Sequence, residues 1–102
     1  MQFIVTSRLI DQPVAPPAQE LAMIKASFQG FAEHSEPRFK AIFPHADERA
    51  TTFLVEVDSA EELTEVIGSL PASRLCTFET HPVTTTQSVL SLLSVWEKGL
   101  QG

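Results

Sequence analysis

Glu79 and His81 are the residues whose types and spacing best suit acid/base chemistry. They lie two positions apart in a segment of alternating character, so in an extended strand both side chains point to one face. A carboxylate beside an imidazole can pass a proton if burial and neighbouring charges tune their pKa values. We therefore expect Glu79, His81 and also Glu56 to be the catalytic candidates. The alternative is an ion pair at a rim, with a surface histidine and no catalysis.

Five more residues are expected to contact a small-molecule ligand on the same face of the predicted sheet. Two of them are cationic and would stabilise a developing enolate. The five substrate-binding candidates are Arg8, Lys40, Thr6, Thr77 and Leu54.

The remaining polar residues give weaker signals. His34 follows a predicted helix, where an imidazolium interacts favourably with the C-terminal dipole. His45 lies near Asp47 and Glu48, but one imidazole and flexible loop carboxylates lack the fixed geometry of a metal site, so we expect no metal. Cys76 alternates with apolar neighbours and is expected in the core rather than as a nucleophile. The four glycines are scattered, so neither a phosphate-binding loop nor nucleotide binding is predicted.

Charge and composition narrow the choice of partners. The formal charge is −6, with 13 acidic and 7 basic residues, so nucleic acids and anionic membrane surfaces are not expected partners. A chain of 102 residues matches one domain spanning residues 1–102. The single cysteine, the lack of a long apolar run and the absence of a secretion signal in the first ten residues predict a cytoplasmic protein.

The hydrophobic period switches several times between 2 and 3.6. Strands are predicted at residues 2–9, 38–43, 51–57 and 75–81, and helices at residues 18–33 and 87–98. A further helix is predicted between the capping pair Ser59 and Glu62 and the helix-ending Pro71. The segment 11–17 breaks regular structure, and its last proline suits the first turn of a helix. The order predicts an α+β, ferredoxin-like βαββαβ fold: a four-stranded antiparallel sheet with two helices on one face, plus a C-terminal helix.

The alternation sorts the side chains of the sheet into a buried face and an open face. The expected core contains Phe3, Val5, Phe53, Val55, Val57, Cys76 and Phe78, with Leu21, Ile24, Phe28, Leu63, Val66 and Ile67 from the helices. The expected open face carries Ile4, Thr6, Arg8, Leu54, Glu56, Leu75, Thr77, Glu79 and His81, joined by Arg38, Lys40 and Ile42 if the second strand keeps Phe39 and Phe43 inward.

This open face is half apolar and half polar, which suits a sheet-to-sheet homodimer that encloses a partly polar cavity. Residues 84–102 form a helical extension whose apolar stripe ends in Trp96, and we expect this extension at the oligomer interface. The alternative is that the last helix folds over its own sheet.

The run from Phe53 to Pro71, FLVEVDSAEELTEVIGSLP, followed by a strand that ends in His81, Pro82 and Val83, resembles the muconolactone delta-isomerase family of the dimeric α/β-barrel superfamily. The resemblance implies a ferredoxin-like protomer, a homo-oligomer that is a face-to-face dimer or a higher assembly of such dimers, and no metal or organic cofactor. For the namesake enzyme it implies a proton shift within a small unsaturated lactone. The segments RFKAIF and HADERATT depart from the family pattern, so no catalytic residue is carried over.

Two functions follow as hypotheses. The first is a cofactor-free isomerase or lyase acting on a small oxygenated carbon compound. The second is a non-catalytic dimeric binding or assembly module, since one fold hosts many functions. A closed pocket of a few hundred cubic ångströms would favour the first.

Overall fold

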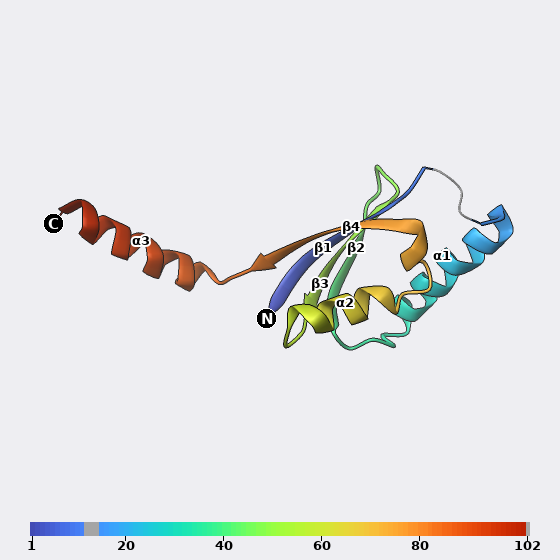
Figure 1. The fold of residues 1–102 in the computed structure, drawn as a ribbon, viewed down its shortest axis with the longest axis horizontal. Coiled ribbons are helices and arrows are strands. Elements are labelled where there is room, and N and C mark those ends of the chain that lie inside the picture. The colour runs from blue at the N-terminus through green and yellow to red at the C-terminus, as the bar shows by residue number, and fades with distance from the viewer. Residues whose placement is uncertain (12–14, 102) are drawn as a thin grey trace.

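The protein is built on one four-stranded antiparallel sheet, seen in a computed structural model that describes residues 1–11 and 15–101 (Figure 1). The spatial order of the strands is β2-β3-β1-β4. Their bounds are β1 (Gln2–Leu9), β2 (Phe39–Pro44), β3 (Ala50–Glu56) and β4 (Cys76–Val83). All four predicted strands are confirmed to within one residue at most ends, because period-two alternation marks a half-buried strand strongly.

The register gives the sheet two ends that matter later. Arg8 pairs with Ala50 on one side and Thr77 on the other, and we call this the Arg8 end. Gln2 pairs with Glu56 and Val83, and we call this the Gln2 end.

Two helices, α1 (Pro17–Ala32) and α2 (Ala60–Gly68), cover the same face of the sheet (Figure 1). A short 3-10 turn, Ser73–Leu75, precedes β4, and α3 (Thr86–Gln101) follows it. This confirms the predicted ferredoxin-like βαββαβ order with an added C-terminal helix. Part of the predicted break at 11–17 lies outside the described residues. Among the described residues, no helix combines the length and apolar character needed to cross a bilayer.

The helix starts follow the sequence signals. Pro17 occupies the first turn of α1, where a missing N–H costs nothing. Ser59 caps α2, its Oγ accepting a hydrogen bond from the Glu62 N–H at 3.1 Å. The Glu62 carboxylate accepts in turn from the Asp58 N–H at 2.8 Å, which satisfies a second N–H group ahead of the helix.

The core lies between the sheet and α2 and confirms most of the alternation. Its buried members are Phe3, Val5, Phe39, Phe53, Val55, Val57, Leu63 and Val66. The Phe31 ring joins them, with its centroid 5.6 Å from that of Phe39 and 5.2 Å from that of Phe53.

Two residues predicted for the core are exposed instead. Leu21 is 66% exposed and Phe28 is 40% exposed. The first turns of α1 extend past the end of the sheet (Figure 1), so Leu21 has no strand beneath it. Phe28, further along α1, borders a space between the helix and the sheet. Leu75 is a correction in the opposite direction: it was predicted on the open face but is only 3% exposed, because it belongs to the 3-10 turn rather than to β4.

Strand β2 contains an irregularity that the sequence did not reveal. The pairing of β2 with β3 shifts between Phe39 and Ala41, so Lys40 occupies a bulge. Phe39 and Ile42 therefore pack toward the core, whereas Phe43 is 61% exposed. The interpretation with Phe39 and Phe43 both inward and Ile42 on the open face is therefore wrong for β2.

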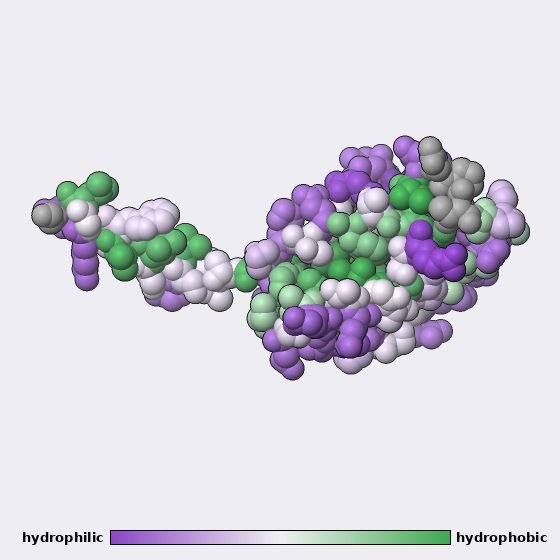
Figure 2. Space-filling model, in the orientation of Figure 1, coloured by the Kyte–Doolittle hydropathy of each residue, from purple (hydrophilic) through white to green (hydrophobic). Residues whose placement is uncertain are grey.

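Helix α3 stands apart from the rest of the chain (Figures 1 and 2). Every described residue of α3 is exposed, and the molecule reaches 64 Å along its longest axis. In this chain the helix does not fold over its own sheet.

Candidate functional site

The predicted pair Glu79 and His81 is held together on the open face of β4. His81 Nε2 lies 2.8 Å from Glu79 Oε1, and Arg8 Nη1 lies 3.5 Å from Glu79 Oε2. The hydrogen bond with His81, followed by the charges of His81 and Arg8, lowers the pKa of the Glu79 carboxyl. All three side chains are about half exposed or more. In the single chain they therefore sit at a rim, and their predicted roles stay predictions.

The same cluster continues through the hairpin loop between β2 and β3. His45 Nδ1 lies 2.8 Å from Glu48 Oε1, and His45 Nε2 lies 2.7 Å from the Thr52 hydroxyl. Arg8 Nη2 is 3.5 Å from the same Glu48 oxygen, so this guanidinium lies between Glu48 and Glu79. The result is a chain of polar contacts across the Arg8 end of the sheet.

Three more predicted residues belong to this face. Thr6 pairs with Thr52, and their hydroxyl oxygens are 3.3 Å apart. Thr77 pairs with Arg8. Leu54 pairs with Ile4 in the middle of the face.

Glu56 and Lys40 are not part of this cluster. Glu56 pairs with Gln2, whereas Glu79 pairs with Thr6, which is roughly 13 Å along β1 at the rise of a strand. Both Glu56 and Lys40 line an open groove at the Gln2 end, beside Arg38 and Glu62. Their predicted roles would require a ligand at that end.

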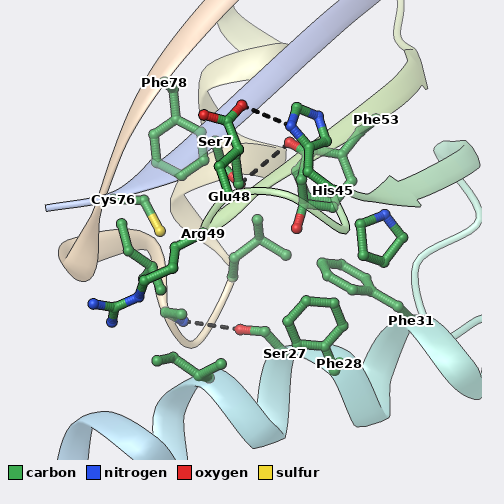
Figure 3. A pocket seen from close by; sticks show the side chains of 17 residues that line it. Ser7, Ser27, Phe28, Phe31, His45, Glu48, Arg49, Phe53, Cys76 and Phe78 are labelled. Atoms are coloured by element: carbon green, nitrogen blue, oxygen red, sulfur yellow. Dashed lines mark hydrogen bonds and ion pairs between the residues drawn. The ribbon is translucent and has the colours of Figure 1, made fainter.

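A cavity of about 200 Å³ lies between α1 and the sheet, on the side opposite the open face (Figure 3). It is near the Arg8 end, and none of the eight predicted site residues lines it. Its walls are mainly apolar side chains: Leu9, Ile24, Phe28, Phe31, Phe53, Leu70, Ala72, Cys76 and Phe78.

The polar groups inside the cavity already have partners. Ser27 Oγ accepts from the Ala72 N–H at 3.0 Å and donates to the Met23 carbonyl at 3.2 Å. Ser7 Oγ donates to the Thr51 carbonyl at 3.4 Å. In the described part of the chain, no buried side-chain nitrogen or oxygen lacks a hydrogen bond. Burial raises the pKa of the Cys76 thiol, which makes this wall residue a poor nucleophile.

Charged groups stand at the mouth of the cavity: His45, Glu48 and Arg49. Figure 3 shows the Glu48 carboxylate and the His45 ring facing each other on the side away from α1. Sequence reasoning set His45 and Glu48 aside as a loop pair. The signal that would have found them is the hairpin itself, which brings residue 45 back beside Thr52.

The loop also fits poorly to a cation. Ligand atoms of His45, Asp47 and Glu48 lie within 4.8 Å of one another. However, His45 Nδ1 and Glu48 Oε1 are already bonded to each other, and the Arg8 guanidinium lies beside the same carboxylate. A metal ion would have to displace both partners, and the prediction of no metal stays a prediction.

His34 takes part in the end of α1 through its backbone. Its φ of 53° is in the left-handed region, where helices often terminate, and its N–H donates to the Phe31 carbonyl at 3.1 Å.

Comparisons with known proteins support the fold. A search of the curated proteins finds no match. Among solved structures, the chain is similar to muconolactone isomerase, with a TM-score of 0.70 and 17% sequence identity over 83% of this chain and 90% of that one. At this identity the likeness establishes the ferredoxin-like fold alone. A family model described as "Domain of unknown function (DUF3303)" matches residues 1–95. Because that match spans nearly the whole sequence, the chain belongs to this family and carries a muconolactone isomerase-like fold.

Proposed function

We propose that this protein binds a small oxygenated carbon compound in the cavity between α1 and the sheet. The observation that carries the proposal is the cavity itself, with apolar walls, satisfied hydroxyls inside and charged groups at its mouth. Such a space favours a compound with an apolar body, because burying its surface displaces water without stranding a polar group. The oxygen of the compound would face His45 and Arg49.

The volume suits a ligand of modest size. An engineered protein cavity of about 150 Å³ lined by aliphatic and aromatic side chains binds benzene. The space here is about 200 Å³, which supports a single ring with one or two substituents. Larger ligands would have to extend out of the mouth.

We infer that the reaction, where there is one, is a cofactor-free proton transfer of the isomerase or lyase kind. His45 is the base favoured by position, because it lines the cavity and its ring is held by Glu48. General-base catalysis needs such a positioned side chain. The predicted pair Glu79 and His81 is linked to it through Arg8. The alternative is a non-catalytic binding module. It is favoured by the engagement of both His45 ring nitrogens.

Binding is tested by ligand-observed NMR with a set of small cyclic acids, lactones and ketones. Cys76→Phe should abolish binding, because the added ring would fill the cavity that Cys76 lines. Thr64→Phe is the matched control, since it places the same ring on the exposed side of α2. If no compound binds the wild-type protein, or if Cys76→Phe binds equally well, the proposal fails.

Chemistry is tested separately on any compound that binds. Proton transfer in D2O would introduce deuterium into that compound, which mass spectrometry detects. His45→Gln should retain binding and lose the exchange, whereas His81→Gln and Glu79→Gln test the predicted pair in the same assay. Bound compound that takes up no deuterium would leave the non-catalytic module as the function.

We further infer that two copies pair through their open faces as a dimeric α/β barrel. The single cysteine favours a reducing compartment, and we propose the cytoplasm. Exposed apolar side chains on this face support the pairing, with Phe43 61% exposed and Val83 37% exposed. Two such faces would cover each other and enclose the Arg8, Glu79 and His81 cluster.

A further inference from the structure

Helix α3 carries an apolar stripe that nothing in its own chain covers. Its members recur at helical spacing and are 44% to 90% exposed: Val89, Leu92, Leu93, Trp96 and Leu100. Large exposed apolar patches on a protein mark interaction sites, and a helix such as this one of 16 residues takes most of its stability from packing of its apolar face. The stripe therefore needs a partner.

In its own chain α3 leads away from the cavity (Figure 1). Val83, the last residue of β4, is at the Gln2 end of the sheet, while Cys76 and the cavity are at the Arg8 end. The two are roughly 23 Å apart along β4. Only Thr84 and Thr85 connect β4 to α3, and two residues span at most about 7 Å, so α3 begins near the Gln2 end.

A second copy can bring the stripe there. When two sheets pack face to face about a twofold axis that runs across the strands, the Gln2 end of one lies over the Arg8 end of the other. Each α3 then starts beside the partner's Arg8 end. At 1.5 Å per residue it is about 24 Å long, enough to pass the end of the sheet and reach the mouth of the cavity.

Helix α1, which lines the cavity, offers a matching surface. Leu21 and Phe28 of α1 are 66% and 40% exposed, and Phe28 forms part of the cavity wall. We propose that α3 of a second copy packs across this mouth, so that the partner's Trp96 closes the cavity of the first copy. The inference rests on the proposed function and adds that each site is completed by the other chain.

Cross-linking tests this arrangement in the full-length protein without any ligand. Gly99→Cys places a thiol on the stripe one turn after Trp96, keeps every apolar side chain, and its Cβ meets no atom within 4 Å. The second thiol is Cys76, the only native cysteine. A short bis-maleimide should give covalent dimers of Gly99→Cys. These dimers should be lost when Cys76→Ser is added. Ser91→Cys, on the opposite side of α3, is the matched control and should give far fewer dimers.

The alternatives give different results. Equal dimer yields with and without Cys76 would mean that α3 pairs with the partner's α3, which overturns the proposal. No dimers at all, with Cys76 accepting a monofunctional maleimide, also overturns it. If Cys76 resists the reagent, Trp96→Asp must make it react faster, and an unchanged rate counts as failure. The cross-linking experiment contains no ligand, so its outcome does not depend on whether the protein binds a small compound. A failure of the proposed ligand binding can therefore be distinguished from a failure of this inference.

Discussion

Arg38 joins the segment before β2 to helix α2 at the Gln2 end of the sheet. Its Nε lies 2.8 Å from Glu36 Oε1, and its Nη1 lies 3.1 Å from Glu62 Oε1. The hydrogen bond from Arg38 lowers the pKa of the Glu36 carboxyl. The pKa of Glu62 is lowered first by the hydrogen bond from the Asp58 N–H and then by that from Arg38. The pKa of Arg38 is raised by the same contacts, so it stays charged.

These shifts predict an acid-sensitive contribution to stability. Carboxyl groups with a lowered folded-state pKa stabilise the fold above their ordinary value of 4.5, and the stabilisation is lost as the pH falls below it. Arg38→Met should weaken this contribution. Melting temperatures measured from pH 7 to pH 3 should therefore converge for the two proteins in acid. Parallel curves would contradict the assignment, and Arg74→Met, on an exposed residue, is the control.

At this scale the sequence predicts pairs within one strand and misses pairs between strands. Glu79 and His81 could be placed together because the side-chain period of a strand is two. His45 and Glu48 could not be linked to Arg8, because that contact depends on the register of β1 against β3 and on the path of the hairpin loop.

Helix α2 shows how one residue fixes the start of an element. Ser59→Ala removes the Oγ that accepts from the Glu62 N–H. We expect a loss of about 1 kcal/mol in the free energy of unfolding, which lowers the melting temperature by roughly 4–8 °C in a domain of this size. Calorimetry checks this.

Thr64→Ala provides the comparison on the same helix. The Thr64 hydroxyl is exposed and donates only to the Ala60 carbonyl one turn earlier, so its removal should change stability by less than about 0.5 kcal/mol. If both variants melt alike, the cap is not what stabilises α2.

Helices and strands were predictable where a single hydrophobic period dominates the segment. They were less predictable where two assignments fit the same residues. Strand β3 and helix α2 follow from alternation and from the cap. In β2, the letters FKAIF fit either face, because a bulge shifts the pattern by one residue without changing its composition. Leu75 was placed on the wrong face for a similar reason. An apolar residue just before a strand can belong either to the strand or to the turn that precedes it, and here it belongs to the 3-10 turn.

Pairing through the open face belongs to the scale of the whole molecule. The bulge in β2 turns the Phe43 ring toward the open face, where it is 61% exposed. Phe43→Glu replaces this ring with a charge. An aromatic anchor at an interface commonly contributes about 2 kcal/mol, so the dimer should weaken roughly thirtyfold. Light scattering across a dilution series measures this. Gln29→Glu, which adds the same charge on exposed α1, should leave the mass unchanged, and an unaltered mass for Phe43→Glu would sink the proposed pairing.

The cavity lay beyond sequence reasoning altogether. It arises because α1 packs on the sheet mainly through Phe31 and diverges toward its N-terminus, and no local pattern encodes the separation of two layers. The sequence analysis therefore placed the pocket on the open face of the sheet. The cavity of about 200 Å³ in the single chain lies on the opposite face, beneath α1.

The projection of α3 also changes how this molecule diffuses and scatters. A compact domain of 102 residues has a radius of gyration of about 13 Å, whereas this chain has 17.6 Å. Such an elongated particle experiences more friction than its mass suggests. A protomer in solution would therefore elute ahead of a compact marker of equal mass, and folding the arm against a neighbour would bring the size per chain back toward that of a sphere.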